Sequence, residues 1–219
     1  DAKNMPTNIT PDGYIEMAKQ HKYLIDIFEE DPKTLMRIGN QAEVNVKGKA
    51  GISRYRDDSG KYRLKGKIEL QSEQGIDPVG KNYWKRKSEP DSFNRGTSYM
   101  GTFLHELIHH YDYTYGVNRW NKGSLSFKDK KTSDKFWLKN ERVMAMSDEI
   151  YTEVVEKFGR VGILNKIEDS LGTYAHDAIA YNNDPSEIVT IAFQKYYNNR
   201  NDELTDFIVN RFIQKYKGL

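Results

Sequence analysis

Two histidines four residues apart, with a glutamate directly after the first, constrain this sequence more than any other feature. They are His105 and His109, with Glu106 between them in the run His-Glu-Leu-Ile-His. In a helix, this spacing places both imidazoles on one face, one turn apart. Two ring nitrogens in that arrangement can occupy two corners of a zinc tetrahedron. Apolar residues at helical spacing surround the run, so the pattern predicts a helix that carries a zinc site.

Glu106 has a separate part in this interpretation. It lies beside the histidines on the helix surface, where it can reach a zinc-bound water without binding the metal itself. Zinc lowers the pKa of such a water to about 7. Glu106 would accept the proton of the attacking water and pass it to the leaving amine. The pattern therefore predicts a zinc-dependent peptidase; the alternative is a surface helix that happens to carry these side chains. His110 falls on another part of the helix and is not expected to be a ligand.

Two histidines leave a zinc site incomplete, so a third ligand has to come from elsewhere in the chain. The best candidate segment is residues 185–193, which read Pro-Ser-Glu-Ile-Val-Thr-Ile-Ala-Phe. His176 and Glu149 are alternative third ligands. No rival catalytic pattern occurs in the sequence, since it has neither Gly-x-Ser-x-Gly nor a phosphate-binding glycine loop.

Two blocks of the sequence resemble one known family of metallopeptidases. The run from His105 to Asp112 resembles the motif helix of anthrax lethal factor and of the secreted Pro-Pro endopeptidases, in which an Asp follows the second histidine at the position of Asp112. Residues 185–197 look like the ligand helix of the same family. The resemblance implies a zincin-like fold, with Glu187 as the third zinc ligand. It covers the C-terminal half of the chain only.

The sequence also departs from that family. His110 and Tyr111 stand where the family has small and aliphatic residues. The family carries a Tyr seven residues before the ligand Glu, which stabilises the oxyanion, but Ala180 occupies that position here. A loop shorter by one residue would bring Tyr181 into this role, and Tyr174 is the alternative. We therefore expect Tyr181 to be the second catalytic residue.

Each of these assignments has a structural competitor. Asp184 and Glu187 also fit a capping box, with Asp at the N-cap and Glu three residues later. Asp112 shares the helix face of His105, so it could support a histidine ligand from behind or simply be solvated. Tyr181 could equally be an ordinary core or surface tyrosine.

The order of expected elements indicates an α+β domain: helices, a small antiparallel sheet with one wet face, then helices. We treat residues 1–219 as one domain, with the helices and sheet in 1–97 and the helical part with the zinc site in 98–219. Residues 72–97 are expected to be irregular. Helices are expected from Thr10-Pro11, from Asp31-Pro32 to Gly39, from Ser98, from Ser133 to Gly159, from Asp184-Pro185 and from Asp202. Strands are expected where apolar residues alternate over 42–46, 52–55 and 62–70, with a turn at 57–60.

Composition excludes several classes of protein. No apolar stretch approaches the roughly 18 to 20 residues of a membrane span. The chain has no cysteine, which excludes disulfides and thiolate metal ligands. Lys and Arg number 34 against 32 Asp and Glu, so the net charge of +2 gives no basis for nucleic-acid binding. Basic clusters at 84–87 and 128–131 are interpreted as solvated loop charges.

These observations favour a secreted bacterial zinc metalloendopeptidase, free or as the catalytic part of a toxin delivered into host cells. The chain begins at Asp1 without a signal-like run, so we expect a mature form or a piece of a longer protein. We expect a monomer that binds an extended peptide or protein against an edge strand, with Lys61–Gln71 as the candidate edge. The alternatives are a catalytically silent docking module and a nucleic-acid binder using residues 83–87.

Overall fold

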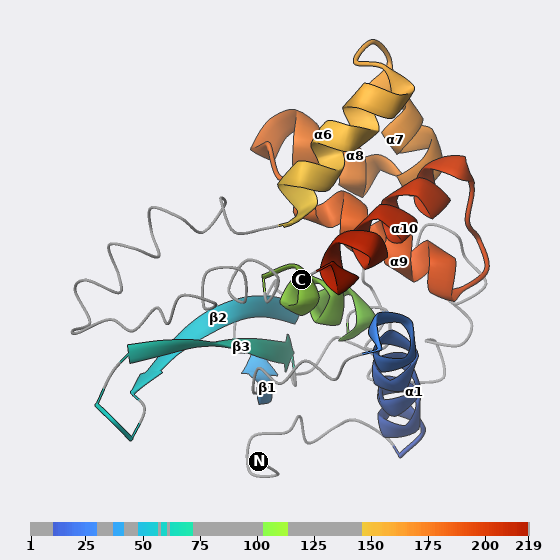
Figure 1. Cartoon of the computed structure of the whole chain (residues 1–219). Coiled ribbons are helices and arrows are strands. Elements are labelled where there is room, and N and C mark those ends of the chain that lie inside the picture. The colour runs from blue at the N-terminus through green and yellow to red at the C-terminus, as the bar shows by residue number, and fades with distance from the viewer. Residues whose placement is uncertain are drawn as a thin grey trace.

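The computed structural model describes residues 11–29, 37–41, 48–56, 58–60, 62–71, 103–113 and 146–218. Helices make up most of this part of the chain, and three strands form one small sheet (Figure 1). The helix over residues 103–113, here called the motif helix, carries His105 and His109. The other helices are α1 (Pro11–Phe28), α6 (Met146–Phe158), α7 (Ile163–Leu171), α8 (Thr173–Asn182), α9 (Ser186–Tyr197) and α10 (Glu203–Lys217).

The sheet differs from the predicted antiparallel one because one of its three strands runs parallel to its neighbour. Its strands are β1 (Arg37–Gln41), β2 (Gly48–Arg56) and β3 (Tyr62–Gln71), in the order β1-β3-β2. The β2–β3 pair is antiparallel, whereas β1 runs parallel to β3. A tight turn closes the β2–β3 hairpin, as predicted, with Gly60 at φ +78°. The hairpin places β3 beside β2, and β1 joins the sheet along the other side of β3.

This strand order bears on the prediction that Lys61–Gln71 is an edge strand for the substrate. Lys61 lies outside the described residues, and the rest of the candidate edge is β3, the central strand. Its C-terminal half, from Lys67 to Gln71, is paired on both sides, so the prediction of an edge there is wrong. Only Tyr62 to Gly66 has a single partner among the described strands.

The helix expectations are confirmed in part. Helix α1 begins at Pro11, and α6 ends at Phe158, directly before Gly159. Helices α9 and α10 begin where predicted, and the Asp202 carboxylate caps α10 by accepting a hydrogen bond from the Thr205 amide at 2.9 Å. The prediction of a helix that ends at Gly39 is wrong at its C-terminal end, because residues 37–39 form part of β1. The segments 42–47, 72–102 and 133–145 lie outside the described residues, so the helix expected from Ser98 is described only from residue 103.

The core places the motif helix in the interior. Phe103, Leu104, Leu107, Ile108 and Tyr111 are all almost fully buried. They belong to one hydrophobic cluster that includes residues of α1, β3, and α6 to α10. In Figure 1 the motif helix, drawn in green, lies between the sheet and the group of helices α6 to α10. The alternative of a surface helix is therefore wrong, since every residue from 103 to 113 except His105 and Tyr113 is buried.

Aromatic contacts hold the motif helix against α1 and α10. The ring of Tyr111 stacks on Phe28 of α1 with centroids 4.5 Å apart, and meets Tyr216 of α10 at 5.4 Å. Such pairs stabilise the fold beyond the burial of their apolar surface.

Among the described residues, no helix has the length and apolar character that crossing a membrane requires.

Candidate metal centre

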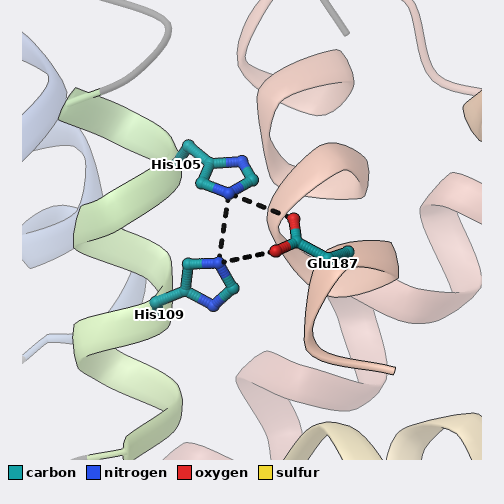
Figure 2. A group of neighbouring side chains, drawn as sticks. All are labelled: His105, His109 and Glu187. Atoms are coloured by element: carbon teal, nitrogen blue, oxygen red, sulfur yellow. Dashed lines mark hydrogen bonds and ion pairs between the residues drawn. The ribbon is translucent and has the colours of Figure 1, made fainter. Parts of the chain in front are cut away.

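Three side chains from two helices converge at one point. His105 and His109 project from the motif helix, and Glu187 projects towards them from the first turn of α9 (Figure 2). The two histidine Nε2 atoms lie 3.1 Å apart. Glu187 Oε2 is 3.1 Å from His105 Nε2, and Glu187 Oε1 is 3.5 Å from His109 Nε2. The side chains are nearly buried, so the three donor atoms share a space largely screened from solvent.

Hydrogen bonds alone cannot account for all three contacts. Each Nε2 of a neutral imidazole carries either one proton or one lone pair, and a carboxylate only accepts. If both histidines donate to Glu187, their own contact brings two N–H groups together. If one donates to the other, that histidine can no longer donate to the carboxylate. A cation at the centre would instead accept a lone pair from each of the three atoms.

The separations of the donor atoms fit a tetrahedral metal. Zinc binds imidazole nitrogen and carboxylate oxygen at about 2.0–2.2 Å, so two ligands of a regular tetrahedron lie about 3.3–3.6 Å apart. The two nitrogens lie 3.1 Å apart, and each faces a different oxygen of Glu187, His105 at 3.1 Å and His109 at 3.5 Å, so these distances lie close to that range. Two imidazoles and one carboxylate are also the donor set of a class of catalytic zinc sites that keep a fourth position open. Within the described chain, no other group of three or more such residues converges in this way.

The electrostatics of the metal-free cluster show strong mutual attraction. Burial lowers the pKa of His109, but the carboxylates of Glu187, Glu106 and Asp112 together outweigh burial and raise it to about 9. Burial likewise disfavours a charged Glu187, yet the two histidines hold its pKa well below the usual range of a glutamate. The cluster therefore attracts positive charge, in the form of a proton or of a metal cation.

Glu106 lies beside this cluster without being one of its donors. Its side chain is buried on the motif helix. Its negative charge acts on both His109 and Tyr174, raising the pKa of each. A carboxylate close to the convergence point is placed to exchange a proton with a group bound there.

Of the two tyrosines considered from the sequence, Tyr174 and Tyr181, the structure brings Tyr174 to the cluster. Its ring centroid lies 6.5 Å from that of His105, and its hydroxyl lies close enough to Glu187 for that carboxylate to raise its pKa. Burial, followed by the carboxylates of Glu187 and Glu106, raises the pKa of Tyr174, so its hydroxyl stays protonated at neutral pH. The hydroxyl is therefore available as a hydrogen-bond donor.

Tyr181, the predicted second catalytic residue, is not the tyrosine that the structure brings to the cluster. Seven residues separate it from Tyr174 on α8, which puts the two about 10 Å apart along the helix axis. The Tyr181 side chain is 78% exposed, against 47% for Tyr174, and its ring neighbour is His176. The sequence argument assumed a shortened loop before Glu187, but α8 continues as a regular helix to Asn182.

Asp112 is buried, so the alternative that it is merely solvated is wrong. It is 1% exposed and accepts hydrogen bonds from the amide and hydroxyl of Ser147, at 3.0 and 2.7 Å. Burial raises its pKa to about 6, although the bonds from Ser147 and the amide of Met146 oppose this. Its charge also raises the pKa of His109. Asp112 thus acts on the histidine through space while it holds the start of α6.

The remaining candidates have other partners. His176 Nδ1 lies 2.9 Å from Asp177, and Glu149 accepts a hydrogen bond from Lys215 at 2.9 Å. His110 is buried away from the cluster, and burial lowers its pKa to about 4. At the start of α9, Asp184 bonds the amide and hydroxyl of Ser186.

The predicted capping box is not formed. The N-cap residue of α9 is Pro185, and Asp184 accepts from the amide of Ser186 and not from that of Glu187. The Glu187 carboxylate turns towards the histidines. Sequence reasoning missed Ser147 and Thr190, a buried hydroxyl near Glu187. For Thr190 a signal was available, because it stands three residues after Glu187 and so on the same helix face. Ser147 had none, because its contact with Asp112 spans 35 residues.

Comparison with known protein families, characterised proteins and solved structures found no match to this chain. The functional interpretation therefore depends on the geometry of the cluster and on the two short blocks of sequence.

Proposed function

We propose that this protein is a zinc metalloendopeptidase with a zincin-like fold. His105, His109 and Glu187 would hold the metal. The observation that carries the proposal is the convergence of these three side chains, from two different helices, with nitrogen–nitrogen and nitrogen–oxygen distances that suit a tetrahedral cation. Glu106 and Tyr174, which lie near the cluster, supply the general base and the hydrogen-bond donor that hydrolysis requires, whereas a purely structural cluster requires neither.

The chain's own residues divide the work of hydrolysis. Zinc at this site would lower the pKa of a bound water and polarise the carbonyl of the scissile bond. Glu106 accepts the proton of the attacking water and delivers it to the leaving amine. The protonated hydroxyl of Tyr174 donates a hydrogen bond to the oxygen that becomes negative as the water attacks. Because that charge develops during the reaction, the bond strengthens on the way to the transition state.

The substrate in this proposal is an extended peptide or protein, and the protein acts outside the producing cell or inside a host cell. The intact set of donors and Glu106 argues against the silent docking module, which would have no use for a buried general base. The near balance of charges argues against nucleic acid as the partner.

The test is cleavage profiling of a diverse peptide library with zinc-loaded protein, with protein treated with a chelator, and with Glu106→Gln. Gln has nearly the size of Glu but cannot accept the proton, so hydrolysis should fall by roughly 10²–10⁴-fold. Zinc content and melting temperature should stay close to those of the wild type. Cleavage that persists after zinc is removed, or near-normal turnover by Glu106→Gln, would overturn the proposal.

A further inference from the structure

Thr190 places a hydroxyl next to the carboxylate of Glu187. It lies one turn further along α9 and is 1% exposed. Its Oγ1 is 3.0 Å from the main-chain oxygen of Glu187 and 3.5 Å from Glu187 Oε2. Oε2 is the same oxygen that faces His105 at 3.1 Å. One hydroxyl therefore lies within reach of both the backbone and the side chain of the candidate third ligand.

The surroundings of Thr190 make a hydroxyl there costly unless it is bonded. Its neighbours in α9, Ile188, Val189, Ile191 and Ala192, are all buried and apolar. A buried hydroxyl without a partner is destabilising, and valine has nearly the same shape. Within the described chain, both contacts of this hydroxyl are with Glu187. Its one hydrogen can be shared between the main-chain oxygen and the carboxylate.

We propose that Thr190 is a positioning residue for the metal site: its hydroxyl holds the Glu187 carboxylate in the orientation in which Oε2 faces His105 and Oε1 faces His109. Groups that hydrogen-bond a metal-binding carboxylate limit its rotation, and their removal typically weakens metal binding by 10–100-fold. This inference rests on the metal-binding part of the proposed function. It does not depend on whether the protein hydrolyses peptides.

A common structural role competes with this one. Threonine hydroxyls in helices often bond the carbonyl three or four residues earlier, with no link to function. That role predicts a change in stability and no change in the affinity of the folded protein for zinc. The two roles therefore differ in what the loss of the hydroxyl does to metal binding.

The experiment is a zinc titration of full-length protein against a chromophoric chelator, at one fixed pH. Thr190→Val removes the hydroxyl and keeps the shape, whereas Thr190→Ser keeps the hydroxyl. Thr205→Val is the matched control, because Thr205 is also fully buried in a helix, and within the described part of the chain its hydroxyl makes no hydrogen bond to Glu187 or the histidines. Thr190→Val should weaken zinc binding by about tenfold or more. Thr190→Ser and Thr205→Val should stay within about twofold of the wild type.

A second measurement covers the case in which Thr190→Val folds poorly. The visible absorption of bound Co²⁺ responds to the arrangement of its ligands, so its band intensities should change in Thr190→Val and be restored in Thr190→Ser. Thr190→Ala, which removes the hydroxyl without adding volume, should behave like Thr190→Val in both assays.

Three outcomes would overturn the inference. In the first, Thr190→Val and Thr190→Ala bind zinc within about twofold of the wild type. In the second, Thr190→Ser is as weak as Thr190→Val, or the cobalt spectra of all variants are the same. In the third, the wild type binds no zinc, which removes the proposed function as well. A wild type that binds zinc but cleaves no peptide overturns the hydrolase proposal alone, and the titration still decides the role of Thr190.

Discussion

The carboxylate of Asp112 caps α6 from a different helix. Its two oxygens accept hydrogen bonds from the amide and the hydroxyl of Ser147, at 3.0 and 2.7 Å. An acidic side chain near the first turn of a helix is also favoured by the helix dipole. Helix α6 packs against α9, which carries Glu187. The contact between Asp112 and Ser147 therefore links the helix of the two histidines to the helix of the third candidate ligand.

Replacing Asp112 by alanine should reduce the free energy of unfolding by about 2–3 kcal/mol, because buried groups of Ser147 lose a charged acceptor. Ser147→Ala removes only the hydroxyl bond and should reduce it by about 1 kcal/mol. Urea denaturation at pH 7 measures both changes. An Asp112→Ala variant that loses less than about 0.5 kcal/mol would show that the cap contributes nothing beyond an ordinary surface contact.

The raised pKa of His109 predicts how zinc binding depends on pH. A metal ion can bind His109 only after its proton leaves, and in the metal-free protein that proton has a pKa of about 9. The apparent zinc affinity should therefore rise by about tenfold per pH unit between roughly pH 6.5 and 9. Zinc titrations over this range measure the slope. An affinity that does not change with pH would contradict the ion pair between His109 and Glu187.

The stability of the metal-free protein should change with pH in the opposite sense. The folded pKa of His109 lies above the 6.5 of an unfolded chain, so its ion pair stabilises fully below pH 6.5 and is lost as the pH rises to about 9. Glu187, whose pKa is lowered, contributes fully above its ordinary value of 4.5, so its contribution does not change over this range. The melting temperature of chelator-treated protein should therefore fall between pH 6.5 and 9. Glu187→Gln is the control, because it should abolish that fall.

Tyr174 and Tyr181 form a matched pair on one helix. Tyr174→Phe should lower kcat by about 10²-fold with little change in KM, because the hydrogen bond it removes strengthens only in the transition state. Tyr181→Phe should leave both constants within about twofold, since its exposed side chain lies away from the cluster. Steady-state kinetics on one good peptide substrate give both results. Equal effects of the two changes would remove Tyr174 from the proposed mechanism.

The local part of the site could be predicted from sequence. The approach of His105 to His109 follows from helical spacing alone, and the apolar residues around them predict a buried helix. Glu187 is 78 residues beyond His109, and no local rule brings the two together. Only the resemblance to a known family suggested it. The structure places Glu187 at the histidines, while its role as a zinc ligand stays a prediction.

The failures of sequence reasoning have physical causes. Residues 37–39 were expected to end a helix, but they form part of β1 because pairing with β3 outweighs their local preference. The order of the strands depends on contacts between distant segments. The alternation of apolar and polar residues within one strand does not reveal which strands pair. Helices α7 and α8 were not predicted. Tyr181 was chosen over Tyr174 by counting back from Glu187, and the count does not carry over because α8 sets its own spacing.

The most direct test of the central claim measures zinc in the wild type and in Glu187→Ala, together with the melting temperature of each. The wild type, purified without added metal or chelator, should hold one zinc per chain, since one cluster converges in the described structure. Glu187→Ala leaves two histidines and should lose both the metal and the peptidase activity. A variant that melts slightly lower yet keeps its zinc would contradict the assignment of Glu187. A wild type that neither contains nor takes up zinc would contradict the metal centre as a whole.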